Sequence, residues 1–199
     1  NVLYGLKTTH KLTIENVIQH TLSVKKGIKK SLLIVDMPKD TYNNVKTAEK
    51  NAKFIVKSTG CDAIKIESNK KNFNIIKHLV KKGIPVMGHI GYTPQFKKRF
   101  KVEGSTLKKM RQLLKEAKFI QNSGAFSIVL ECISTKASKY ITKKLSIPTI
   151  GIGSSSFCDG QILVTDDMLG LSGFYPKFVK KYANLNRVIA KAVKKYTRD

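Results

Sequence analysis

Short continuous apolar runs alternate along this chain with longer stretches in which apolar residues recur every three or four positions. Continuous runs are typical of β-strands covered on both faces, and the longer spacing is typical of amphipathic helices. The runs predict strands at residues 32–35, 63–66, 85–87, 126–130, 148–152 and 161–164. The alternation of strand and helix indicates βα units and a parallel sheet.

Three of the intervening segments carry a clear apolar helical face. These faces comprise Ile14, Val17, Ile18 and Leu22; Ala48, Ala52 and Ile55; and Leu107, Met110, Leu114 and Ala117. Glycines end three helical patterns just before the next strand, where glycine adopts the left-handed conformation; they are Gly60, Gly83 and Gly124.

The pattern predicts a single α/β domain over residues 1–199. Two architectures remain open at this point, a (β/α)₈ TIM-type barrel and an open doubly wound sheet. A complete barrel has eight strands and typically ~250 residues. Because the pattern supplies only six strands, a barrel would lack two of them.

The chain is strongly basic, with 38 Lys and Arg against 13 Asp and Glu and a formal net charge of +25. Arginine is the residue best suited to bidentate phosphate and base contacts, yet most of the basic residues are lysines. Their doublets are scattered along the chain rather than gathered in one stripe. We therefore expect a lysine-rich solvated surface that attracts anions, and no nucleic-acid partner.

Composition excludes several classes of protein. A hydrophobic content of 41% argues against disorder, and no apolar run approaches the ~20 residues that cross a membrane. The chain start lacks an export signal. The three cysteines, Cys61, Cys132 and Cys158, form no CxxC pair, which favours a reducing compartment over disulfides or structural zinc. We expect a cytoplasmic protein without a membrane partner.

Ionisable residues stand at the carboxyl ends of four successive predicted strands. They are Asp36, Lys65, Glu67, His89 and Glu131. Active sites of parallel α/β folds form at this edge of the sheet, so we expect these side chains to converge. Since strand side chains alternate between faces, Lys65 and Glu67 point the same way and place an ammonium beside a carboxylate.

Each residue also has a purely structural interpretation. Asp36 precedes Met37 and Pro38 and could shape a turn; Lys65 and Glu67 could form an ion pair at the rim, and His89 could be a hydrogen-bonded core histidine. Glu131 follows four apolar residues, and a buried carboxylate costs free energy unless it is paired or protonated. Glu131 is therefore the strongest single candidate for a general base.

Two converging carboxylates suit Mg²⁺, which prefers oxygen ligands and leaves positions for substrate oxygens. A metal ion held there could chelate a 2-oxo acid through its carboxylate and ketone and acidify the adjacent carbon. Glu131 could then accept the proton. The residues by themselves indicate carbanion chemistry on an anionic oxo compound and leave the electrophile open.

Several strings together resemble the ketopantoate hydroxymethyltransferase family. They are LLIVDMP, AIKIE, GHIGYTPQ, GAFSIVLEC, IPTIGIGSS, CDGQILVTDDMLG and PKFVKKYANL. The resemblance implies a (β/α)₈ barrel, Mg²⁺, and transfer of a hydroxymethyl group from 5,10-methylenetetrahydrofolate to 3-methyl-2-oxobutanoate through a magnesium-stabilised enolate. The product would be 2-dehydropantoate, in pantothenate (coenzyme A precursor) biosynthesis. The resemblance also implies a large, decamer-like homo-oligomer.

Residue by residue, the resemblance assigns Asp36 and Glu67 to the metal site and Asp36 and Lys65 to contacts with the oxo acid. It assigns Glu131 as the proton acceptor and places His89 nearby as an orienting group. The family has a Gly-Asp-Ser, with a further metal-site Asp, just before the segment that resembles the start of this chain. We therefore expect a chain truncated at its N-terminus, without the first two barrel strands, that is poorly active by itself.

Two other functions remain open. Lys65 could attack a carbonyl as the nucleophile of a Schiff-base aldolase, although the adjacent Glu67 argues against a neutral amine. Alternatively, the basic chain could be a noncatalytic binding remnant of an enzyme, whose affinity for nucleic acid would fall steeply with salt.

Overall fold

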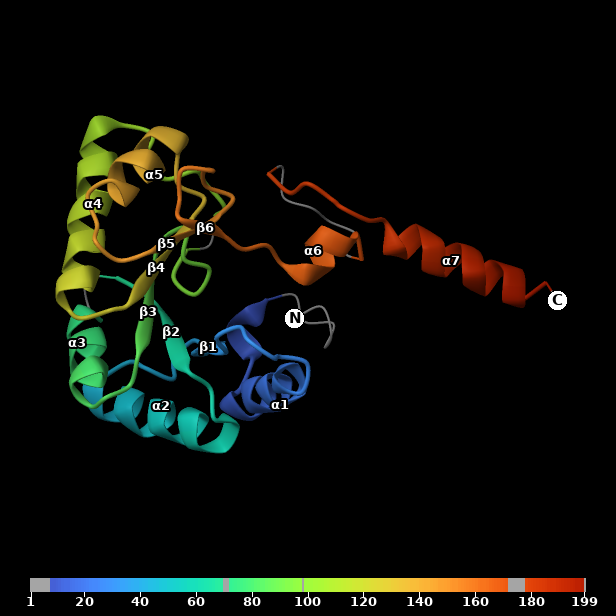
Figure 1. Cartoon of the computed structure of the whole chain (residues 1–199), viewed down its shortest axis with the longest axis horizontal. Helices are drawn as coiled ribbons and strands as arrows, with labels where there is room; N and C mark the ends of the chain where they lie inside the picture. The colour runs from blue at the N-terminus through green and yellow to red at the C-terminus, as the bar shows by residue number, and fades with distance from the viewer. Residues whose placement is uncertain (1–7, 70–71, 98, 172–177, 199) are drawn as a thin grey trace.

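The computed structural model describes residues 8–69, 72–97, 99–171 and 178–198. Two segments that resemble the family, the one at the chain start and the one from Pro176, begin outside these ranges. Six strands form one sheet (Figure 1): β1 (Ile34–Asp36), β2 (Ala63–Glu67), β3 (Val86–Gly91), β4 (Ser127–Glu131), β5 (Thr149–Ile152) and β6 (Gly160–Gln161). They pair in sequence order, and every pair is parallel. The sheet curls into part of a TIM-type barrel, which confirms the predicted fold class.

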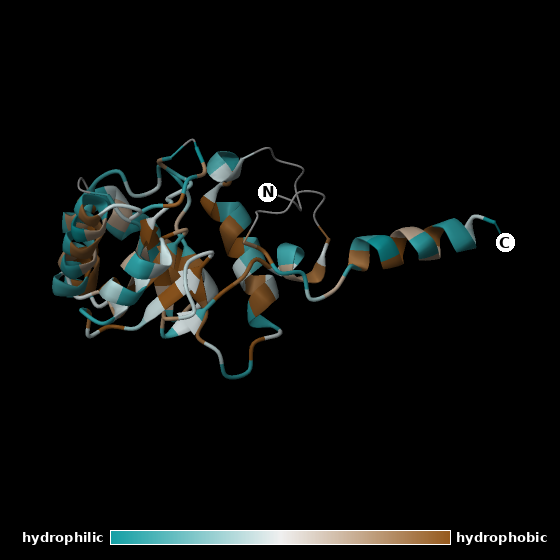
Figure 2. Ribbon diagram, turned by 90° about the horizontal axis from the view of Figure 1, so that it is seen from above, coloured by the Kyte–Doolittle hydropathy of each residue, from teal (hydrophilic) through white to brown (hydrophobic). Residues whose placement is uncertain are grey.

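Helices precede β1 and follow each of β1 to β4 on the outer side of the sheet (Figure 1). They are α1 (Ile14–Lys25), α2 (Val45–Thr59), α3 (Phe73–Lys81), α4 (Leu107–Asn122) and α5 (Thr135–Thr142), and a short 3-10 helix, η2 (Thr9–Lys11), precedes α1. Beyond β6 come α6 (Thr165–Leu169) and α7 (Leu185–Tyr196), and α7 projects away from the sheet in both views (Figure 1, Figure 2). None of the described helices is both long and apolar enough to cross a bilayer.

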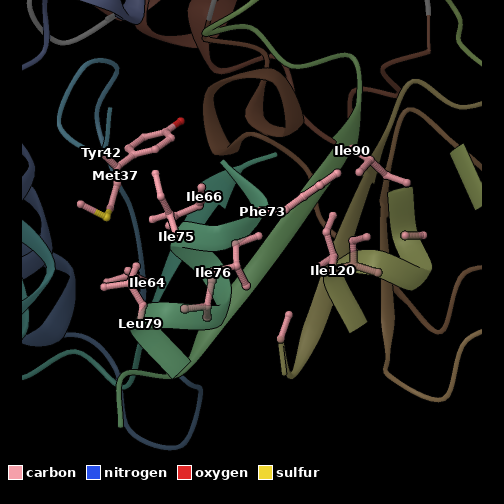
Figure 3. Close-up of a cluster of buried hydrophobic side chains, with 14 of the residues drawn as sticks. Met37, Tyr42, Ile64, Ile66, Phe73, Ile75, Ile76, Leu79, Ile90 and Ile120 are labelled. Atoms are coloured by element: carbon pink, nitrogen blue, oxygen red, sulfur yellow. The ribbon is translucent and has the colours of Figure 1, made fainter. Parts of the chain in front are cut away.

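The core lies between the sheet and the outer helices (Figure 3). Ile64 and Ile66 of β2 and Ile90 of β3 are almost fully buried, as are Ile76 of α3 and Ile120 of α4. Burying each such side chain stabilises the fold by roughly 1.5–3 kcal/mol. The packed core holds the strand ends at fixed positions relative to one another.

The predicted helix ends are confirmed. Gly60, Gly83 and Gly124 have φ values of 60°, 76° and 90°, in the left-handed region. At the other end of the helices, short polar side chains accept backbone N–H groups, as Asn44 does from Thr47 and Thr106 does from Lys109. These caps supply hydrogen bonds to N–H groups that lack a partner within the helix.

Two sequence predictions were wrong in detail. The last strand covers only Gly160–Gln161, and the apolar run after it, including Ile162 and Val164, is largely exposed. Within the described residues β6 pairs with β5 alone, so that run has no second strand to cover it. On α4 the buried face contains Leu113, Ala117 and Ile120, whereas Leu107 in the first turn is 69% exposed.

Gly91 ends β3 with a φ of 99°, and a Cβ there would lie 2.1 Å from the carbonyl oxygen of Glu131. The absence of a side chain therefore lets the ends of β3 and β4 approach closely. Gly83 also has a positive φ, but a Cβ there would meet nothing within 4 Å. A side chain at Gly83 would therefore add backbone strain alone, whereas a side chain at Gly91 would add both backbone strain and a steric clash.

We predict that Gly91→Ala lowers the free energy of unfolding by roughly 1–3 kcal/mol more than Gly83→Ala does, because only the first change adds a clash to the strain. Urea unfolding of both variants measures the difference. Equal losses of unfolding free energy in the two variants would show that the clash between a Cβ at position 91 and β4 adds no cost.

Candidate active site

The carboxyl ends of β1 to β4 open into one cavity of about 360 Å³. All five residues selected from the sequence line it, namely Asp36, Lys65, Glu67, His89 and Glu131. The strand register explains this, because Asp36 lies level with Lys65, Glu67 with His89, and Gly91 with Glu131. The structure thus brings together side chains that are far apart in the sequence.

Lys65 forms an ion pair with Asp36, with 2.6 Å between Nζ and Oδ2. The sequence predicted that the ammonium of Lys65 lies beside Glu67. Glu67 does line the same cavity, but Lys65 forms its ion pair with Asp36 on the neighbouring strand β1. The Asp36 side chain is 51% exposed, so the pair adds little stability. Its effect is to hold a positive charge and a carboxylate at the mouth of the cavity.

Glu67 is only 3% exposed. Its Oε2 accepts the backbone N–H of Gln95 at 2.9 Å. Burial is the main cause that raises the pKa of Glu67 to about 7; the charges of Asp36 and Glu131 raise it further, while Lys65 and the Gln95 N–H oppose the rise. A buried carboxylate with this environment favours a bound proton or a bound cation near neutral pH.

Glu131 has a similar environment at the end of β4. Burial raises the pKa of its carboxyl to about 7; the charge of Asp36 adds to the shift, and Lys65 opposes it. Its side chain keeps 18% exposure, so it remains accessible from the cavity. A carboxylate whose pKa lies near 7 is well suited to accept and return a proton.

His89 lies beside Glu131 and is 1% exposed. Its Nε2 is 3.2 Å from Oε2 of Glu131, but the atoms lack the alignment of a hydrogen bond, and neither ring nitrogen has a hydrogen-bond partner among the described residues. Burial, followed by Lys65, lowers the pKa of His89 well below its usual value, so the ring is neutral. His89 is therefore buried as a core histidine would be, but no hydrogen bond of its ring is found among the contacts of the described residues.

Sequence reasoning missed two polar residues beside this site. Gln95, in the loop after β3, donates through Nε2 to the carbonyl oxygen of Met37 at 2.9 Å and accepts the hydroxyl of Tyr42 at 2.5 Å. Both Gln95 and Tyr42 are buried. The one signal in the sequence was the position of Gln95 at the end of GHIGYTPQ, a string that resembles the family.

The donor chemistry of the cavity fits Mg²⁺. Asp36 and Glu67 line the same cavity, and the charge of Asp36 adds to the cost of ionising Glu67. Mg²⁺ is commonly held by one or two carboxylates together with water and substrate oxygens. Within the described ranges, no group of three or more His, Cys, Asp or Glu residues is arranged to hold a metal ion. The fit therefore rests on two carboxylates.

Comparison with known proteins identifies relatives along the whole chain. A family model described as ketopantoate hydroxymethyltransferase matches residues 1–199. A 3-methyl-2-oxobutanoate hydroxymethyltransferase from Pelagibacter ubique is 48% identical over 199 residues, covering 100% of this chain and 77% of the relative. The protein of the same name from Clostridioides difficile is 46% identical, covering 98% of this chain and 73% of the relative.

Solved structures share the fold at low sequence identity. A 2,3-dimethylmalate lyase, described as a member of the PEP mutase/isocitrate lyase superfamily, aligns with a TM-score of 0.62 and 12% identity, over 100% of this chain and 71% of the other. A lyase/mutase described as putative, from Burkholderia cenocepacia, aligns with a TM-score of 0.56 and 10% identity, over 94% of this chain and 66% of the other. These similarities concern the fold alone.

The raised pKa of Glu67 predicts how stability depends on pH when divalent cations are removed by a chelator. Between the ordinary pKa of a glutamate and about 7, the folded chain binds this proton more tightly than the unfolded chain, so the free energy of unfolding falls as pH rises. Glu67→Gln removes the ionisation and should make this fall shallower. Chemical unfolding at several pH values from 5 to 8 measures it.

Glu116→Gln is the matched control, since Glu116 lies on α4 outside the cavity and hydrogen-bonds to Gln112. It should keep the pH dependence of the wild-type chain. Parallel curves for Glu67→Gln and the wild-type chain would contradict the electrostatic description of the cavity.

Proposed function

The chain belongs to the ketopantoate hydroxymethyltransferase family, and on that premise we propose that it transfers a hydroxymethyl group from 5,10-methylenetetrahydrofolate to 3-methyl-2-oxobutanoate. The product is 2-dehydropantoate, an intermediate of pantothenate biosynthesis. The observation that carries the proposal is the convergence of five ionisable side chains from four strand ends on one cavity. Such a site matches the chemistry of a small anionic oxo acid.

Lys65 supplies the positive charge for the carboxylate of the oxo acid. Its charge acts on Glu67, His89 and Glu131, and all four side chains line the same cavity. Asp36, paired with Lys65 at 2.6 Å, orients the ammonium and contacts the same substrate. The net charge of +25 favours the approach of an anion to the whole molecule.

Asp36 and Glu67 are the residues that would hold Mg²⁺. When bound, the ion polarises the 2-oxo group and makes the neighbouring C3–H more acidic. In the chain itself, burial and the charges of Asp36 and Glu131 make ionised Glu67 costly, and a cation offsets that cost. The two carboxylates therefore combine a need for positive charge with the oxygen ligands that Mg²⁺ prefers.

Glu131 accepts the proton from C3 of the oxo acid. Water cleaves both C–N bonds of the methylene carbon, its two hydrogens going to the folate nitrogens N5 and N10, so that tetrahydrofolate leaves and the carbon becomes formaldehyde. The C3–H bond breaks, its electron pair forms the new C–C bond to the formaldehyde carbon, and Glu131 returns the proton to the resulting alkoxide oxygen. Neutral His89, with Nε2 at 3.2 Å from Glu131 Oε2, aligns the carboxylate or a substrate oxygen when the site fills, since such contacts often tighten only in the complex.

The Schiff-base alternative has less support. A Schiff base requires a neutral amine, whereas Lys65 donates to the carboxylate of Asp36 at 2.6 Å. Covalent trapping of substrate on Lys65 with borohydride would favour this alternative over metal-assisted proton abstraction. The noncatalytic remnant has no supporting observation beyond the basic composition.

We extend the proposal to a decamer-like homo-oligomer. The supporting observation is α7, none of whose residues is buried. Val188, Ile189 and Val193 on this helix are all more than half exposed. Exposed apolar helix faces are typical of contact surfaces between proteins.

We predict that Glu131→Gln in the complete enzyme lowers the rate of 2-dehydropantoate formation at saturating Mg²⁺ by about 10²–10⁴-fold, because an amide cannot accept the proton. Substrate affinity should change much less, since Lys65 and Asp36 remain. Steady-state kinetics in an enzyme assay with folate cosubstrate measures both. Glu103→Gln is the control, because Glu103 lies between β3 and α4, does not line the cavity and pairs with Lys97 at 2.7 Å. Unchanged turnover in Glu131→Gln would remove Glu131 as the base.

A further inference from the structure

Gln95 connects its own loop to the loop after β1 and to the end of β2. It lies in the loop between β3 and α4, is 8% exposed, and lines the cavity. Its Nε2 donates to Met37 O at 2.9 Å, its Oε1 accepts from Tyr42 at 2.5 Å, and its backbone N–H donates to Glu67 Oε2 at 2.9 Å. Because a carbonyl oxygen can only accept, Met37 fixes which end of the amide faces it.

Of the partners of Gln95, one is a candidate metal ligand and another directly follows the second candidate ligand in the chain. Met37 directly follows Asp36 at the end of β1, and Met37 is fully buried. Glu67 ends β2 and receives its hydrogen bond from Gln95 itself. One buried residue therefore joins the backbone beside the first carboxylate to the oxygen of the second.

We infer that Gln95 is a positioning residue that sets the placement of Asp36 and Glu67 toward each other for a divalent cation. The inference rests on the proposed function, because it requires that these carboxylates hold the ion. Mg²⁺ demands near-ideal octahedral geometry, so small shifts of either carboxylate weaken its binding. Outer partners that orient metal ligands typically control metal affinity in this way.

The side chain of Gln95 holds in place the loop whose backbone N–H donates to Glu67. Gln95→Ala removes the bonds to Met37 and Tyr42 and leaves a buried carbonyl and a buried hydroxyl without their partner. The loop that carries the backbone N–H is then no longer held against β1. The Glu67 carboxylate loses its fixed direction, although both candidate ligands are still present.

Tyr42→Phe provides a finer change. It deletes only the hydroxyl that donates to Gln95 Oε1 and keeps the buried ring. The bond between Gln95 Nε2 and Met37 O remains in this variant. We expect Tyr42→Phe to weaken cation binding in the same direction as Gln95→Ala, but less.

Titration calorimetry with Mg²⁺, and separately with Mn²⁺, tests the inference on the wild-type chain and its variants. We predict that Gln95→Ala binds either ion about 10–100-fold more weakly than the wild-type chain. Gln112→Ala is the matched control, because Gln112 is exposed on α4 and bonds only to Glu116 among the described contacts of its side chain. It should bind as the wild-type chain does. Saturating Mg²⁺ should restore most of the turnover of Gln95→Ala, which a merely misfolded site would not show.

The possible results separate the inference from the function beneath it. If the wild-type chain binds neither ion, the metal site of the proposed function fails, and the role of Gln95 fails with it. If the wild-type chain binds and Gln95→Ala binds equally tightly, only the role of Gln95 is overturned. If circular dichroism shows that Gln95→Ala does not fold, Tyr42→Phe decides, and wild-type affinity in a folded Tyr42→Phe chain overturns the inference.

Discussion

The proposed site depends on the interaction of one lysine, Lys65, with three carboxylates that line the same cavity. Asp36 forms an ion pair with Lys65. The charge of Lys65 opposes a rise in the pKa of Glu67 and Glu131, but burial still raises each to about 7. The single ammonium does not offset three buried or half-buried negative charges. The cavity therefore favours protons, a divalent cation, or both, and the proposed metal-binding and proton-accepting roles follow from this excess of negative charge.

The fold makes that arrangement possible because parallel strands deliver their carboxyl ends to one edge. Gly91 lets β3 and β4 approach at that edge, where a Cβ would meet the carbonyl of Glu131. The loop after β3 then turns back and places the N–H of Gln95 on Glu67. Packing of the helices against the sheet fixes the strands, and the loop hydrogen bonds fix the side chains that the strands carry.

Most of the site could be predicted from sequence because it follows a simple rule of parallel sheets. Asp36, Glu67 and Glu131 each follow an apolar run, so their convergence needed no knowledge of loops. Gln95 and Tyr42 could not be found this way, since they meet across 53 residues through loop conformations that leave no periodic pattern. The partner of Lys65 was also out of reach, because it depends on the register between β1 and β2 rather than on spacing within one strand.

The apolar pattern was least informative at the edge of the sheet and at helix ends. The run from 161 to 164 resembles a buried strand, yet Ile162 and Val164 are exposed, because burial there depends on a neighbouring strand rather than on the run itself. Leu107 similarly belongs to an apolar periodicity but is exposed in the first turn of α4. The converging carboxylates by themselves indicated a magnesium site, whereas only the family resemblance supplied the electrophile.

The most direct measurement of the central claim is exchange of the C3 hydrogen of 3-methyl-2-oxobutanoate with deuterium from solvent, followed by NMR without folate. The cavity is proposed to make this C–H acidic and to supply Glu131 as the proton acceptor. Mg²⁺-dependent exchange by the wild-type chain, lost in Glu131→Gln, is the expected result. Exchange that proceeds equally well in Glu131→Gln, or that is absent from a wild-type chain shown to bind Mg²⁺ and the oxo acid, would contradict it.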